Sequence, residues 1–126
     1  MRQLWAAVAL LTGMLALLAW NGILLERQLT PMAEELHQAA IAAQQEDWDR
    51  AASLTQALEE RWQGQVPYLQ IVYSHTRLDQ VALSFLELKG ALACQAAEDY
   101  TASALRIAGT MEAMVCLERL SVGNLL

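Results

Sequence analysis

The sequence predicts an all-α protein in which an N-terminal transmembrane helix precedes a small antiparallel helical bundle built from two αα-hairpins. Three observations predict this fold. An uncharged apolar run opens the chain, apolar residues then recur at helical spacing in four stretches, and both prolines stand where a helix can begin. The bundle is therefore expected to be held at a membrane.

The apolar run covers residues 4–25, with Thr12 and Asn21 as its polar side chains and no charge. As a helix it is about 33 Å long, enough to cross a bilayer core. It lacks the small-residue cleavage site of a secretory signal peptide. Trp5 and Trp20 stand near its ends, where indole rings favour the membrane interfaces. We therefore expect residues 1–26 to be retained in the lipid bilayer as a single-pass signal-anchor.

Orientation and charge follow from the flanking residues. Arg2 and the amino terminus precede the span, which favours a cytoplasmic N-terminus and places residues 27–126 outside the cell membrane as one extracytoplasmic domain. Without Arg2 and Glu26, the eight basic and fourteen acidic residues of the chain leave seven and thirteen for this domain. An acidic surface repels phosphate backbones, so no nucleic-acid partner is expected.

The first two helices of the bundle are predicted from capping residues and apolar stripes. Thr30 and Pro31 predict a helix start, and Asp47 predicts a second start, with Gly64 as that helix's end. The segment 66–73 has a strand-like composition, but an isolated strand would leave its backbone unpaired, so we predict a short helix from Pro67. The two stripes are Leu29, Met32, Leu36, Ala39 and Ala43, then Trp48, Ala51, Thr55, Leu58 and Trp62.

Two further stripes predict the second hairpin: Leu78, Val81, Phe85, Leu88 and Leu92, then Ala104, Ile107, Met111 and Met114. The hairpins look related, because residues 39–48 align without gaps on residues 91–100 at an offset of 52. Both segments put an acidic pair and an aromatic ring, Trp48 or Tyr100, at the predicted turn. A duplicated αα-hairpin explains this, and a chance match of two alanine-rich helices is the alternative.

Four segments together resemble a known family: the anchor with Trp5, and residues 46–62, 73–81 and 117–126. Over essentially the whole chain they are similar to an uncharacterised family of short, single-pass, membrane-anchored helical proteins from Gram-positive, mostly clostridial, bacteria. The family has no assigned activity to carry over. His75 and Asn124 are the matching positions that the resemblance singles out, and the chain departs from the family in ending with Leu126 instead of an aromatic residue.

The residues that could carry chemistry are better explained structurally. Ser74, His75 and Asp79 include the residue types of a hydrolase triad, but neighbours on a helix project about 100° apart and cannot form the required line. The candidate metal ligands His37, His75, Cys94 and Cys116 lack ligand-pair spacing, and the two cysteines are predicted too far apart for a disulfide. No enzyme activity, metal or cofactor is therefore expected.

The remaining prediction is a membrane-tethered helical interaction or scaffold module whose partner is itself or another integral membrane protein. Small residues on one side of the span would let a second helix approach closely. The third predicted helix of the bundle, with Leu83 and Leu86 added to its stripe, has more apolar positions than one neighbour can cover. Either the bundle encloses it, or residues 122–126 cover it, or one side of it is a docking surface. The alternative is an extracytoplasmic sensor of a small ligand or of pH, through His75. The candidate interaction residues are Ala6, Ala9, Gly13, Ala16, His75, Leu83, Leu86 and Asn124.

Overall fold

The computed structural model describes residues 1–125, with all side chains in that range except those of residues 72 and 121–125. It contains four helices and, within these residues, no strand: α1 (Arg2–Gln44), α2 (Trp48–Val72), α3 (His75–Ala93) and α4 (Ala97–Leu125). The predicted all-α class is confirmed. The two expected hairpins are α1 with α2 and α3 with α4.

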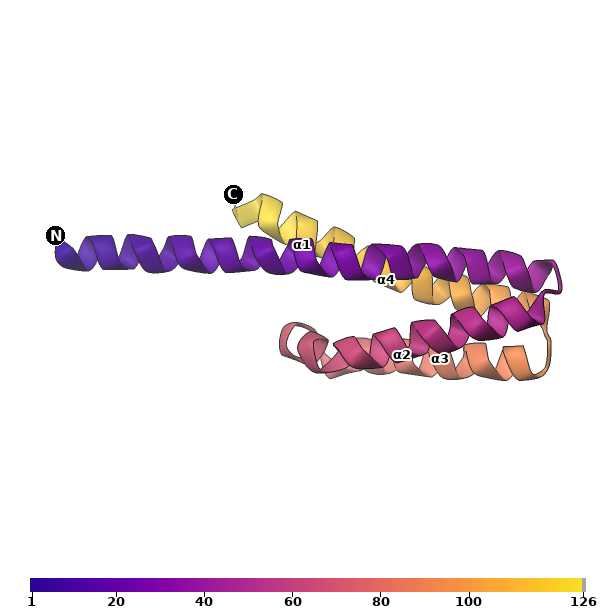
Figure 1. Cartoon of the computed structure of the whole chain (residues 1–126). Helices are drawn as coiled ribbons and strands as arrows, with labels where there is room; N and C mark the ends of the chain where they lie inside the picture. The colour runs from indigo at the N-terminus through magenta and orange to yellow at the C-terminus, as the bar shows by residue number, and fades with distance from the viewer. Residues whose placement is uncertain (126) are drawn as a thin grey trace.

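The helices pack as an up-and-down bundle in which successive helices run in opposite directions (Figure 1). Helix α1 contacts α2 and α4, and α3 contacts the same two helices, so α1 and α3 stand on opposite corners of the bundle. The N-terminal half of α1 projects well beyond the other helices (Figure 1). Over the described residues, α1 is the helix that is long and apolar enough to cross a membrane.

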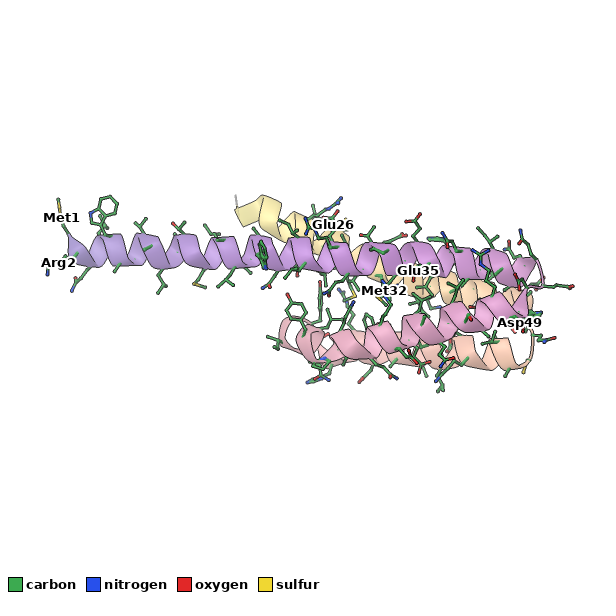
Figure 2. All side chains as sticks on the ribbon, viewed as in Figure 1. Met1, Arg2, Glu26, Met32, Glu35 and Asp49 are labelled. Atoms are coloured by element: carbon green, nitrogen blue, oxygen red, sulfur yellow. The ribbon has the colours of Figure 1, made fainter. Side chains whose placement is uncertain are left out.

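The predicted apolar stripes form the core, with Trp48 and Leu92 partly buried at its edge. All five residues of the α1 stripe and all four of the α4 stripe are fully buried. In Figure 2, Met32 points from α1 toward α2, whereas the side chains near Met1 and Arg2 face no other helix. Helix α1 is thus exposed over its N-terminal half and central to the core over the rest. The core it joins also includes Leu58, Trp62, Val81, Phe85, Leu88 and Tyr100.

Aromatic residues pack between the hairpins. The Trp48 and Tyr100 rings meet edge to face, with centroids 6.0 Å apart. The buried Tyr100 hydroxyl lies 2.6 Å from the Thr55 hydroxyl and donates to the Ala51 carbonyl at 3.3 Å. The two aromatic residues that the sequence placed at the hairpin turns therefore lie in contact with each other.

Helix α1 does not begin at Thr30, as the sequence indicated, but runs through Pro31 without a break. A proline inside a helix removes one backbone hydrogen bond and crowds the preceding turn. Here its neighbours Leu29 and Met32 are both fully buried, and Pro31 itself is exposed. Packing on either side of the proline therefore holds the helical conformation through it. The boundary predicted between residues 26 and 27 falls inside this continuous helix.

Helix α2 likewise continues past Gly64 and through Pro67 to Val72, so Gly64 is not a cap and no separate helix begins at Pro67. Its expected start is confirmed, because Asp47 Oδ1 accepts a hydrogen bond from the Arg50 backbone N–H. Trp62 and Leu69 are buried on either side of Gly64 and Pro67, and their packing keeps the helix continuous. The helical reading of residues 66–73 is right, and its boundary is wrong.

The two hairpin turns have the same backbone hydrogen bonds at an offset of 49 residues, not 52. Each closes a helix with a Schellman motif, in which Asp47 N–H donates to the Ala42 carbonyl and Ala96 N–H to the Ala91 carbonyl. The left-handed residues are Glu46 and Gln95, with φ of 61° and 52°. The offset of 52 matched composition, whereas the chain repeats its turn geometry three residues earlier. Glu98 and Asp99 consequently lie in the first turn of α4.

Candidate functional site

A polar cluster joins the apolar half of α1 to the bundle. The Tyr68 hydroxyl, near the end of α2, donates a 2.7 Å hydrogen bond to Asn21 Oδ1 on α1. Both side chains are partly buried. Asn21 is one of the two polar residues of the predicted span, and this bond gives its amide oxygen a partner from the bundle. The bundle therefore already contacts the span at Asn21, five residues before the predicted domain boundary.

A second tyrosine ties the α2–α3 turn to α4. The Tyr73 hydroxyl lies 3.3 Å from Glu118 Oε1 and 3.4 Å from the Met114 carbonyl oxygen. Burial, followed by the nearby Glu118 carboxylate, raises the pKa of Tyr73 well above its usual range, while Arg77 opposes this shift. Burial and Glu118 also raise the pKa of Tyr68. Both phenols are therefore protonated donors at neutral pH.

The Arg119 guanidinium pairs with the Glu26 carboxylate on the other side of this cluster. The pair crosses between α1 and α4 at the level where α1 leaves the bundle, and Figure 2 shows Glu26 beside the last turns of α4. An open cleft of about 210 Å³ adjoins it, lined by Ala19, Gly22, Ile23, Glu26, Glu118 and Arg119. We call the set Asn21, Glu26, Tyr68, Tyr73, Glu118 and Arg119 the junction cluster.

The junction cluster makes contacts between helices and carries no arrangement typical of catalysis. Its hydroxyls and carboxylates are paired with one another, with a backbone carbonyl, with an amide, or with the Arg119 guanidinium. Among the residues that the structure describes, no three His, Cys, Asp or Glu side chains are grouped to hold a metal ion. What the arrangement can do is fix the direction in which α1 leaves the bundle.

The predicted small-residue seam of the span is accessible. Ala6, Ala9, Gly13 and Ala16 are all exposed, and a Cβ atom built on Gly13 would meet nothing within 4 Å. Eighteen residues make five helical turns, so Ala9 and Ala16 share their angle with Arg27 and Glu34. Those two residues are exposed on the outer surface of the bundle. The seam therefore faces away from the bundle along the whole of α1.

The other candidate residues lie elsewhere. Leu83 and Leu86, on α3, are 57% and 61% exposed, so one side of that helix is not covered by the bundle. His75 is exposed at the first turn of α3, between Ser74, which precedes the helix, and the exposed Asp79. Because α3 is diagonal to α1, these residues lie across the bundle from α1. Asn124 is in the last turns of α4, and its side chain lies outside the described residues.

The two cysteines are free and exposed. Cys94 ends α3 at the hairpin turn, and Cys116 lies five turns into α4. Neither thiol is buried against the bundle. Cys94 borders an open cleft of about 400 Å³ between α3 and α4, whose lining also includes Gly90, Asp99, Ser103 and Arg106.

Residues 20–125 match a domain of unknown function, DUF4363. The chain belongs to this family. The match begins at Trp20, one residue before Asn21 makes its bond to Tyr68, so the DUF4363 unit comprises the bundle together with the junction cluster. The predicted membership of an uncharacterised family is confirmed by this match. No curated protein and no solved structure matches the chain.

Sequence reasoning missed the junction cluster of this DUF4363 protein. In the sequence, Asn21 is one polar residue within the apolar span and has no evident partner. Tyr68 and Tyr73 belong to a segment of ambiguous secondary structure. The available signal was chemical. An amide deep in an apolar run needs a partner, because an unpaired polar group in hydrocarbon costs several kcal/mol. Two tyrosines in one short segment offered suitable donors.

Proposed function

We propose that this DUF4363 protein is a single-pass bacterial membrane protein whose helical bundle, on the extracytoplasmic side, acts as a tethered interaction or scaffold module without catalytic activity. The observation that carries the proposal is the double use of α1. One continuous helix, long and apolar enough to cross a membrane, supplies both an exposed apolar N-terminal part and the centre of the bundle core. The bundle would thus be held rigidly, without a flexible linker.

The seam of Ala6, Ala9, Gly13 and Ala16 supports a partner within the membrane. Small side chains let two transmembrane helices pack closely, and a helix on this seam would meet no obstruction because the bundle lies on the opposite side of α1. The partner is a second copy of this chain or another integral membrane protein. Leu83 and Leu86 lie across the bundle and would not share that contact.

Site-specific photo-crosslinking in native membranes tests this proposal. A photo-crosslinking amino acid is placed at Ala9, on the seam, and at Ala7 as the matched control, since Ala7 has the angle of the buried Leu25. We expect a crosslinked product from Ala9 and not from Ala7. A product of twice the monomer mass identifies self-association, and another mass identifies a second membrane protein. Equal yields from both positions would contradict the seam as an interface.

The substitution Gly13→Leu adds a second test on the same seam. The open space around Gly13 accepts the larger side chain within one chain, so folding of the monomer should be unaffected. We expect the Ala9 crosslink to fall at least several-fold, because the leucine separates the two backbones. An unchanged yield would remove the main support for the interaction module.

The sensor of a small ligand is the second candidate, and the cleft between α3 and α4 favours it. That cleft has about 400 Å³ and combines the Arg106 and Asp99 side chains with Gly90 and Ala91. If the seam tests fail, this cleft becomes the site to probe. Ligand binding there should protect Cys94, at its rim, from alkylation, with Cys116 in the same chain as the internal control.

A further inference from the structure

The end of the bundle nearest the span exposes apolar side chains. Ile71, in the last turn of α2, is 84% exposed, and Leu117 and Leu120 on α4 are 45% and 57% exposed. Trp20 and Ile23 on α1 are exposed at the same end. We call this end of the bundle the base, defined by Ile71, Leu117 and Leu120. Apolar side chains exposed together at one end of a bundle are typical of a surface that meets a protein or a membrane.

The length of free helix below the base is too short for a bilayer. The Tyr68–Asn21 bond fixes the level of α2 on α1, and Ile71 lies three residues farther toward the α1 N-terminus, about 4.5 Å on. The apolar helix below the Tyr68–Asn21 contact is therefore residues 4–20, about 25 Å long. A bilayer core is about 30 Å thick and needs about 20 helical residues. A span of about 20 residues from Leu4 would end near residue 24, past Asn21 and the level of Ile71, so the base would not stand clear of the bilayer.

Aromatic side chains gather at this same level. Trp20 on α1, Tyr68 on α2 and Tyr73 at the α2–α3 turn lie at the base end, with the two phenols bonded to Asn21 and Glu118. Tyrosine and tryptophan favour the membrane–water interface, where the ring meets acyl chains and the polar tip meets headgroups or polar protein atoms. The aromatic residues thus mark the base as an interfacial level.

The charges are distributed to suit a membrane at the base. Arg27, Arg77 and Arg119 are accompanied there by Glu26, Asp79 and Glu118, so this end is close to neutral, whereas the other eleven of the fourteen acidic residues lie farther from the span. A bilayer with anionic headgroups repels an acidic surface and accepts a neutral or slightly basic one. The acidic part of the bundle would face water, away from the lipid.

We propose that the base of the bundle is seated in the interfacial region of the bilayer, with Ile71 inserted at the boundary between headgroups and acyl chains. The occupant of this apolar surface is lipid. The inference rests on the proposed membrane anchor and adds to it a second, lateral contact. With α1 spanning the bilayer and the base resting on it, the bundle would be fixed in height as well as direction.

Spin labelling of the full-length protein in phosphatidylcholine–phosphatidylglycerol vesicles tests the seating. In a Cys94→Ala, Cys116→Ala background, single labels are placed through Leu11→Cys in the span, Ile71→Cys at the base and Leu83→Cys on α3. Leu83 is the matched control, because it is a 57% exposed aliphatic residue outside the base. Power saturation then compares collisions with oxygen, which concentrates in lipid, against a water-soluble nickel complex.

The Ile71 label should collide with oxygen at least several-fold more, relative to nickel, than the Leu83 label, and less than the Leu11 label. A label introduced by Leu120→Cys should also have a higher ratio of oxygen to nickel collisions than the Leu83 label. This label tests the base from α4. If the Leu11 label collides mainly with oxygen but the Ile71 and Leu83 labels have equal ratios of oxygen to nickel collisions, the seating is overturned and the anchor stays in place. A water-like Leu11 label would overturn both the anchor and the seating.

Discussion

The Tyr68 hydroxyl of α2 donates to the Asn21 amide oxygen of α1 at 2.7 Å, which bonds the bundle to a residue inside the predicted membrane span. The bond crosses 47 positions of the chain. It sets the level at which α1 emerges, and together with the Glu26–Arg119 pair it fixes α1 from two neighbouring helices. The junction is therefore built by tertiary contacts and not by a linker.

Removal of the Tyr68 hydroxyl should weaken the junction measurably. We expect Tyr68→Phe to lower the free energy of unfolding in detergent micelles by about 0.5–1.5 kcal/mol, because Asn21 then loses its partner. The double variant Tyr68→Phe with Asn21→Leu removes both polar groups. In a double-mutant cycle the combined loss should be smaller than the sum of the single losses. Additive losses would mean that the bond contributes nothing to the junction.

The buried indole of Trp62 is expected to contribute strongly to the core. Trp62 is 3% exposed, and its ring centroid lies 6.4 Å from that of Phe85 on α3. Trp62→Ala should lower the free energy of unfolding by about 3–5 kcal/mol, since it leaves a large cavity. Chemical denaturation followed by circular dichroism measures the loss. Leu83→Ala, at an exposed position of α3, is the control and should change stability by less than about 1 kcal/mol. Equal losses would contradict the packing.

Both hairpin turns should be improved by glycine. Glu46 and Gln95 occupy the left-handed position of a Schellman motif with φ of 61° and 52°, a conformation that L-residues adopt at a cost. We expect Glu46→Gly and Gln95→Gly each to raise the free energy of unfolding by up to about 1 kcal/mol. Gln45→Gly, one residue earlier at φ −86°, should lower it. Destabilisation by all three variants would show that the turns differ from the described geometry.

Stability should fall at alkaline pH. Burial raises the pKa of Tyr73, Tyr68 and Tyr100 in the folded chain above the ordinary value of about 10. The unfolded chain therefore releases these protons first, so stability is full below about pH 10 and declines as pH rises above it. Melting temperatures in micelles across this range measure the decline. The melting temperature of the Tyr73→Phe variant should decline less steeply with pH than that of the unchanged protein. Identical profiles for the two proteins would mean that Tyr73 does not cause the decline.

The sequence predicted the elements whose packing follows one helical face. The stripes Leu29–Met32–Leu36 and Ile107–Met111–Met114 are buried as expected, because apolar spacing directly determines which side of a helix faces the core. Local end signals were less informative. Pro31 and Gly64 stand inside α1 and α2, since burial of residues on both sides of each outweighs a cost of about 3 kcal/mol for the proline and about 1 kcal/mol for the glycine.

The candidate site was predictable only in part. The exposure of the seam and of Leu83 and Leu86 follows from their positions around the helix, which can be calculated from the spacing of residues in the sequence. The junction cluster does not, because Asn21, Tyr68 and Glu118 come from three helices and meet only through the relative axial positions of those helices. The shared turn geometry at an offset of 49 was hidden for a similar reason. A Schellman motif depends on backbone conformation, and Glu46 and Gln95 are not the glycines that usually mark it.

The central claim is that one continuous α1 passes from the membrane into the bundle. Double electron–electron resonance between spin labels at Leu11→Cys and Ile41→Cys, in the Cys94→Ala, Cys116→Ala background, tests it most directly. Both positions are exposed and 30 residues apart. Labelled protein diluted with unlabelled protein in vesicles should give one narrow distance distribution centred near 45 Å, the length of 30 residues of unbroken helix. A broad distribution, or one centred well below that distance, would contradict the continuous helix.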